Sequence, residues 1–124
     1  MPPKPTLFFW PLGDRSVPNP EEQDLIRAAA GPLTSSILYR TDLAATAAQA
    51  IGETLPANYN PHQFIEDVLT DRTTTLVAKT AQQQLTGFFT VDGASLIDLN
   101  TILAGTFPVP LRVKLFEATV PVQP

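Results

Sequence analysis

The sequence contains no cysteine and only one histidine among its 124 residues. Without cysteine the chain has no disulfide, no thiolate nucleophile and no zinc–sulfur site. The single histidine, His62, is too few for a histidine-rich metal site, and its neighbours include no Ser, Cys or acid at a catalytic spacing. We therefore predict a structural or solvated role for His62, and we expect no metal and no other cofactor.

Charged residues are also scarce. They make up 16% of the chain, against about 25% in a typical soluble domain. The net charge is −4, and among the eight cations only Arg112 and Lys114 form a close pair. This scatter argues against a nucleic-acid partner, which requires a concentrated basic surface. No apolar run approaches the roughly 18 residues of a membrane span, so we expect no membrane partner either.

Motifs of catalysis and phosphate binding are absent as well. The chain has six glycines, and no two of them are close enough to form a phosphate-binding loop. No Gly-x-Ser-x-Gly motif accompanies Ser35, Ser36 or Ser95, the hydroxyls that a triad with His62 would need. These absences predict that the protein is not an enzyme.

Proline and aromatic residues, in contrast, are concentrated at the chain ends. Ten of the thirteen prolines lie in residues 1–20 and 108–124. Proline fixes φ and donates no backbone hydrogen bond, so residues 1–19 are predicted to be an extended arm. The apolar part of this arm is too large to leave in water and supplies predicted interaction residues: Leu7, Phe8, Phe9, Trp10 and Leu12. The arm docks on a neighbouring subunit or on its own domain, and the sequence leaves both open.

Residues 20–120 are predicted to form one domain, followed by a short tail at 121–124. Cap and stop signals predict three helices, between Asn19 and Gly31, Thr41 and Gly52, and Asn60 and Asp71. Runs of β-branched and aromatic residues predict strands at 33–39, 73–80 and 85–91, the last two as a hairpin across 81–84. After a tight turn at Asp92-Gly93, a short helix from Ser95 is favoured over a strand.

The clearest predicted strand spans residues 111–120. Leu111, Val113 and Leu115 alternate there with Arg112 and Lys114, and prolines on both sides are typical of an edge strand. The three apolar residues are therefore a second predicted interaction surface. The elements together predict an α+β fold: a small single domain with three or four short helices and a roughly four-stranded, mainly antiparallel sheet.

One segment resembles an enzyme family. Within residues 64–91, a predicted helix is followed by Leu76-Val77-Ala78, a short turn and Leu85-Thr86-Gly87-Phe88. This order is similar to the helix–strand–strand segment of acetyl-CoA-dependent N-acetyltransferases. The family's pyrophosphate-binding loop, Arg/Gln-x-x-Gly-x-Gly/Ala, has no match after Val91. A degenerate acetyltransferase-like domain is therefore the third of three functional hypotheses.

The leading hypothesis is a non-enzymatic structural protein. Low charge, fifteen threonines and a proline-rich arm are typical of a chain that hides much of its surface in contacts. We predict a small subunit of a larger symmetric particle such as a bacteriophage virion, as a capsid cement or decoration, neck or baseplate component. Its expected partners are protein subunits of the same or a larger assembly, including further copies of itself as a homo-oligomer.

The second hypothesis is a small soluble protein-binding or regulatory module, with the arm folded onto its own core. Localisation separates the hypotheses poorly. Residues 7–12 are too short and too interrupted by proline to be the core of a signal peptide. We therefore expect synthesis in the cytoplasm of the host, with the virion as a candidate final location.

Overall fold

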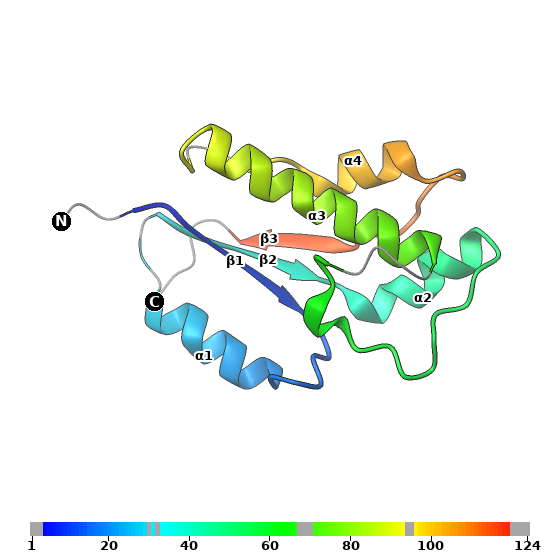
Figure 1. Cartoon of the computed structure of the whole chain (residues 1–124), viewed down its shortest axis with the longest axis horizontal. Coiled ribbons are helices and arrows are strands. Elements are labelled where there is room, and N and C mark those ends of the chain that lie inside the picture. The colour runs from blue at the N-terminus through cyan, green and yellow to red at the C-terminus, as the bar shows by residue number, and fades with distance from the viewer. Residues whose placement is uncertain (1–3, 30, 32, 67–70, 94–95, 120–124) are drawn as a thin grey trace.

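The protein has an α+β fold, seen in a computed structural model of the whole chain (Figure 1). The structure describes residues 4–29, 31, 33–66, 71–93 and 96–119. Within them, four α-helices, one 3-10 helix and three strands follow in the order β1 (Thr6–Pro11), α1 (Asn19–Ala29), β2 (Thr34–Tyr39), α2 (Thr41–Ala50), η1 (Pro61–Gln63), α3 (Arg72–Thr90), α4 (Leu99–Thr106) and β3 (Phe116–Thr119). The predicted tail at 121–124 lies outside the described residues.

The three strands form one mixed sheet in the order β1-β2-β3. β1 runs parallel to β2, with Thr6 opposite Thr34, and α1 makes the crossover that parallel neighbours require. β3 runs antiparallel to β2, with Phe116 opposite Tyr39. The prediction of a mainly antiparallel sheet of about four strands is therefore matched only in its general class. The predicted arm contributes its residues 6–11 to this sheet as β1.

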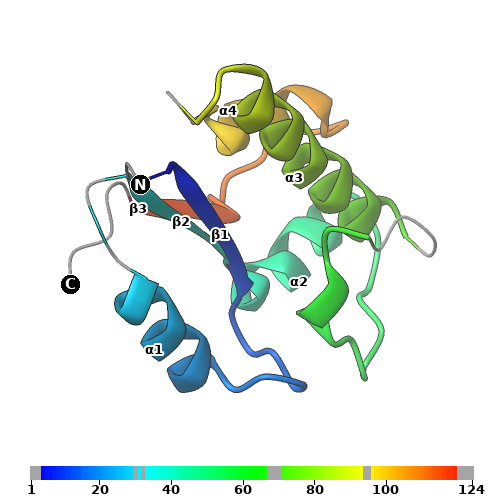
Figure 2. The same cartoon turned by 60° about the vertical axis from the view of Figure 1, so that its left-hand side comes forward.

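Helices cover both faces of the sheet. α1 lies against one face, while α2, α3 and α4 lie on the other (Figure 2). The main core fills the second side, where Ile37 and Tyr39 of β2 pack against buried residues of α2, α3 and α4. On the first side the cover is thinner, because Ile26 is the one residue of α1 that is buried.

Helix α3 replaces the predicted hairpin at 73–91, so both of those strand predictions are wrong. Its β-branched and aromatic residues favoured strands, but the buried positions Thr73, Val77, Ala81, Gln84 and Phe88 recur at helical spacing. Asp71 caps the helix by accepting hydrogen bonds from the backbone N–H of Thr74 and from its hydroxyl. Packing of one face against the core therefore overrode local propensity.

The loss of these strands also removes the basis of the acetyltransferase resemblance. The segments Leu76-Val77-Ala78 and Leu85-Thr86-Gly87-Phe88 both lie inside the continuous helix α3. Asp92 and Gly93 form the predicted turn, with φ values of 52° and 73° that suit a left-handed stop after a helix. The helix–strand–strand order that resembled the family is therefore absent from this chain.

The predicted strand at 111–120 was too long, because β3 begins only at Phe116 and its described part ends at Thr119. The alternation is nevertheless present: Leu115 is buried, Leu111 and Val113 pack against the core, and Arg112 and Lys114 are exposed. Alternation requires only an extended backbone, and it does not require a pairing partner. The sequence pattern therefore gave the inward face correctly and the extent of the strand incorrectly.

Four of the remaining predicted elements are confirmed with shifted boundaries. Helices α1 and α2 and strand β2 lie where expected. The favoured helix near residue 95 is α4, capped by Asp98, which accepts hydrogen bonds from the N–H groups of Asn100 and Thr101. The helix predicted from Asn60 is only the short η1 followed by a turn, and its expected continuation at 67–70 lies outside the described residues.

Candidate functional site

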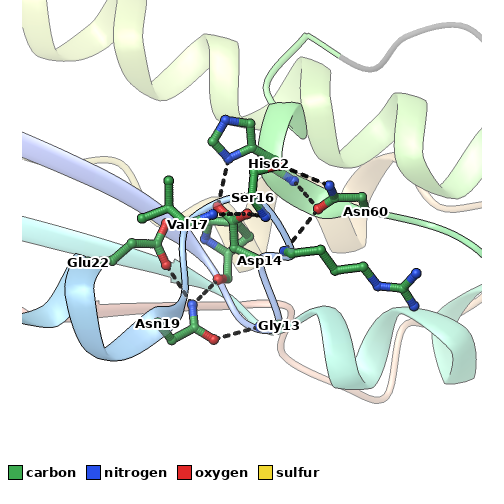
Figure 3. A network of polar contacts seen from close by, with 10 residues as sticks. Gly13, Asp14, Ser16, Val17, Asn19, Glu22, Asn60 and His62 are labelled. Atoms are coloured by element: carbon green, nitrogen blue, oxygen red, sulfur yellow. Dashed lines mark hydrogen bonds and ion pairs between the residues drawn. The ribbon is translucent and has the colours of Figure 1, made fainter.

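Two features of the sheet deserve consideration as sites. The first is a polar network beyond the carboxyl end of β1, where the β1–α1 loop meets η1 (Figure 3). In open sheets with parallel strands, ligands commonly bind beyond the carboxyl ends of those strands. The second feature is the outer edge of β1 itself, which includes four of the eight predicted interaction residues.

Asp14 is the centre of the polar network. Its side chain is 1% exposed and accepts hydrogen bonds from the backbone N–H groups of Ser16 (2.7 Å) and Val17 (3.0 Å). A third contact, of 2.8 Å, joins Asp14 Oδ2 to Nδ1 of His62, whose side chain is 41% exposed. This contact favours the tautomer protonated at Nδ1 and connects two segments that lie 48 residues apart.

Two asparagines extend the network on either side. Asn60 accepts hydrogen bonds from the N–H groups of Arg15 and His62 and donates one to Oγ of Ser16. Asn19, at the start of α1, donates to the carbonyl of Pro11 (2.7 Å) and accepts from the N–H of Gly13 (2.7 Å). The loop between β1 and α1 is thus fastened both to the helix that follows it and to η1.

The carboxyl groups of this network titrate abnormally. Burial raises the pKa of Asp14, but hydrogen bonds from His62, Val17 and Ser16 outweigh it, so the pKa lies below its ordinary value. Burial raises the pKa of Glu22 above its ordinary value, and the neighbouring Asp14 adds to the effect. The hydrogen bond that Asn19 donates to Glu22 (2.6 Å) opposes this shift without cancelling it.

The hydrogen bonds of the network hold the β1–α1 loop in place. An Asp–His pair can serve as a general base when a nucleophile meets the second imidazole nitrogen. Here the nearby hydroxyl, Ser16 Oγ, accepts its hydrogen bond from Asn60 instead. Among the described residues, no group of three or more His, Cys, Asp or Glu side chains is arranged to hold a metal ion. No sequence pattern indicates the Asp14–His62 contact, because only the tertiary fold brings the two segments together.

The second feature is the outer edge of β1. Two backbone hydrogen bonds show which peptide groups of β1 face β2. Thr6 N–H donates to the carbonyl of Leu33 (3.0 Å), and Leu12 N–H donates to the carbonyl of Tyr39 (2.9 Å). In a parallel pair the backbone alternates, so the even-numbered residues of β1 face β2 and the peptide groups of Leu7 and Phe9 face outward. These outward peptide groups form no hydrogen bond with the described residues.

The opposite edge, at β3, is closed at one of its two outward positions, Phe116, while the peptide groups of the other, Ala118, have no hydrogen bond to the described residues. Phe116 directs its peptide groups away from β2, because its neighbour Leu115 accepts the ladder bond from Arg40. The side chain of Asn100 on α4 meets these groups, donating Nδ2–H to the Phe116 carbonyl (2.7 Å) and accepting from its N–H (3.0 Å). At Phe116, one amide side chain therefore does what an additional strand would do.

The predicted interaction residues divide between the two faces of the sheet. Leu7 and Phe9 point to the main core, and the rings of Phe9 and Phe64 pack edge to face at 6.2 Å. Phe8 and Trp10 alternate with them and point to the α1 side. The Trp10 indole nitrogen is buried and lacks a hydrogen-bond partner among the described residues. Leu12 follows the strand and is half-buried.

The second predicted surface is not an open strand edge. Leu111 and Val113 precede β3 and line a cavity of about 290 Å³ beside α2, together with Val109 and Ala47. Leu115 is fully buried in the core. The structure therefore brings Leu7 and Phe9 into one sheet edge and leaves Leu111, Val113 and Leu115 on the inner side of a coil segment.

Comparison with known proteins adds no identification. No helix among the described residues is long and apolar enough to cross a membrane. No protein-family model, no curated protein and no solved structure matches the chain.

Proposed function

We propose that this chain is a non-enzymatic assembly protein, a small subunit of a larger symmetric particle such as a bacteriophage virion, in which the outer edge of β1 makes the contact between subunits. The observation that carries the proposal is the pair of outward peptide groups at Leu7 and Phe9. Strand addition to a sheet edge uses such groups for affinity and the alternating side chains for specificity.

The composition of the edge supports the same proposal. Soluble proteins usually protect an edge strand with charged side chains, prolines, a bulge or a covering element. Between Pro5 and Leu12 this chain has no charged residue, and its apolar sequence is Leu7-Phe8-Phe9-Trp10. Pro5 and Pro11 protect the ends of β1, but the outward peptide groups of Leu7 and Phe9 between them have no such protection. An edge left open in this way is a liability for a free monomer and an advantage for a subunit that is covered after assembly.

The sheet also refines how the contact is made. β1 pairs with β2 of its own chain, so Leu7 and Phe9 already contribute their side chains to their own core. The contact to a neighbour therefore comes from the backbone of β1, and the side chains of Leu7 and Phe9 do not insert into a groove on another subunit.

The same pairing favours one second candidate, a protein-binding module whose arm is part of its own domain. The two functions differ in how long a partner covers the edge of β1. An assembly subunit holds its neighbour permanently in a particle, whereas a module exchanges between a free and a bound form.

Sedimentation in extracts of the source organism tests the proposal. Leu7→Pro removes one outward N–H and leaves the β1–β2 ladder intact, and Ala118→Pro is the matched control at the outward position of β3. We expect the wild-type chain and Ala118→Pro to sediment with a particle much larger than one chain, and Leu7→Pro to remain in the supernatant. A wild-type chain that sediments as a monomer in these extracts would overturn the proposal, and so would a Leu7→Pro chain that still sediments with the particle.

A further inference from the structure

Prolines bound the open edge of β1 symmetrically. Pro5 and Pro11 lie three residues before and three residues after Phe8. Both are odd-numbered like Leu7 and Phe9, so they occupy the next outward positions on either side of these two residues. Neither proline can donate a hydrogen bond, and the carbonyl of Pro11 is already taken by Asn19. The outward donors of β1 are therefore two N–H groups placed symmetrically about Phe8.

This symmetry matches the requirements of an antiparallel pair of identical strands. If two copies of β1 meet with Phe8 opposite Phe8, Leu7 of each copy lies opposite Phe9 of the other. Such directly opposed residues exchange two hydrogen bonds when their peptide groups face each other. Both outward N–H groups of each chain are then paired, and the next opposed pair is Pro5 with Pro11, where no donor is left unpaired.

The geometry points to a second copy of this chain as the strand that covers β1: two β1 strands pair antiparallel about a two-fold axis at Phe8, joining the two sheets into one. This inference rests on the proposed function and names the partner at that edge. A contact about a two-fold axis uses the same surface on both subunits and closes on itself. The outer edges of the joined sheet are the two β3 strands, where Asn100 already occupies the peptide groups of Phe116.

The side chains near the axis are compatible with this register. On the α1 side, Phe8 would meet Phe8 of the second copy, and Thr6 would meet Trp10. Aromatic residues directly opposite each other on paired strands stabilise the pairing. No charged residue lies between Pro5 and Leu12, so the register places no like charges opposite each other.

Phe89 provides a second contact at each end of the pair. It is 76% exposed, the highest exposure among the large apolar side chains of the described residues. It lines a cavity of about 370 Å³ with Pro5, and Gly93 packs so closely against Pro5 that a Cβ there would overlap the proline. In the proposed register, this end of β1 meets the Pro11 end of the second copy. The inferred dimer therefore places Phe89 next to the other subunit.

Cysteine cross-linking tests the register directly, because the natural chain has no cysteine. Opposed residues without mutual hydrogen bonds have Cα atoms about 4.5 Å apart, within disulfide range. We expect purified Phe8→Cys to form a disulfide-linked dimer under mild oxidation. Thr6→Cys is the matched control, because its two copies would lie about four residues, or roughly 13 Å, apart along the pair and should stay uncross-linked.

Amide hydrogen exchange of the unmodified chain provides a readout that does not depend on a variant folding. The Leu7 and Phe9 amides should exchange about fivefold more slowly at a total chain concentration about tenfold above the dimer Kd than in the monomer, because about one fifth of the chains are then still monomeric. The Phe8 and Trp10 amides, which face β2, should change much less. Cross-linking of Thr6→Cys as readily as Phe8→Cys would overturn the register.

Two outcomes separate this inference from the proposed function. A purified chain that stays monomeric over a hundredfold concentration range, with unprotected Leu7 and Phe9 amides, overturns the second copy as the partner. If the same chain nevertheless sediments with a particle, and Leu7→Pro does not, the edge binds a different subunit and the proposed function holds. If neither association occurs, both are wrong.

Discussion

The two edges of the sheet differ in how their outward peptide groups are satisfied. At β3, the side chain of Asn100 binds both the N–H and the carbonyl of Phe116. At β1, two prolines remove donors at the ends of the strand, and Leu7 and Phe9 between them keep theirs. The protein therefore closes one position of the β3 edge with a dedicated side chain, while the peptide groups of Leu7 and Phe9 on β1 stay available for association.

The two edges also depend on different parts of the structure. Asn100 is held on α4, which Asp98 caps, so the closed edge depends on the correct position of a helix. The open edge depends instead on the β1–α1 loop, where Asn19 and Asp14 fasten the carboxyl end of β1. Each edge therefore has its own support, and the two can be perturbed separately.

The largest expected effect tests which residues of β1 direct their peptide groups towards β2. Phe8→Pro removes a donor that faces β2 and leaves a carbonyl of β2 unpaired, so we expect a loss of at least about 3 kcal/mol in the free energy of unfolding. Leu7→Pro removes only an outward donor and part of a half-buried side chain, so we expect about 1–2 kcal/mol. Urea unfolding followed by circular dichroism measures both values. Equal losses would contradict the assignment of Phe8 to the side facing β2 and of Leu7 to the outer side.

The next largest effect opens the closed edge. Asn100→Ala leaves the N–H and carbonyl of Phe116 without their partner, and we expect a loss of about 2 kcal/mol in the free energy of unfolding. Gln49→Ala, which truncates an exposed amide on α2, is the matched control and should change stability by less than about 0.5 kcal/mol. The same urea titrations measure both. Equal stability of the two variants would show that Asn100 does not support β3.

The support of β1 should respond to acid. The pKa of Asp14 is lowered in the folded protein, so its ionised form stabilises the fold above the ordinary value of 3.8, and this contribution is lost as the pH falls through the folded pKa. Glu22 has a raised pKa, so it acts in the opposite direction, and its contribution is lost as the pH rises through its folded pKa.

Urea midpoints measured between about pH 2 and pH 7 separate the two groups. Asp14→Asn should flatten the fall in stability below about pH 4, whereas Glu22→Gln should flatten the opposing change at higher pH. Unchanged acid profiles in Asp14→Asn would show that the network does not support the loop after β1.

The smallest expected effect concerns salt. Two copies, each with a net charge of −4, repel one another at long range, while the contact at β1 itself is uncharged. Raising the ionic strength from about 0.05 M to 0.5 M screens this repulsion, so we expect association to strengthen by about two- to threefold. Light scattering after size exclusion measures it. Weaker association in salt would indicate that ion pairs hold the contact.

Local signals in the sequence predicted some elements well. Asn19 with Pro20, Gly52 and the Asp92-Gly93 turn are start and stop signals that depend on adjacent residues, and the elements that they bound are present. The strand at 34–39 was also predicted, because its β-branched and aromatic residues suit a pleated surface. Such signals are read correctly because both partners in the interaction lie within a few residues of each other.

Helix α3 shows where local propensity misleads. Thr73, Thr74 and Thr75 favour strands by composition, but Thr73 and Thr74 are buried and the hydroxyl of Thr74 bonds to Asp71. The carboxylate of Glu53, nineteen residues earlier, accepts from the N–H of Arg72, and it binds Thr73 as well. Neither of these stabilising groups is visible in the propensity of the segment.

By itself, the sequence determined the broad α+β class, the absence of cysteine chemistry and the symmetric placement of prolines around Phe8. These features depend on residue identity or on contacts between near neighbours. Only the tertiary structure decided that residues 6–11 form a parallel edge strand, that Asn100 binds Phe116 at the other edge, and that His62 meets Asp14. Each of these joins residues far apart in the chain, and such contacts depend on how the helices and strands pack around one core.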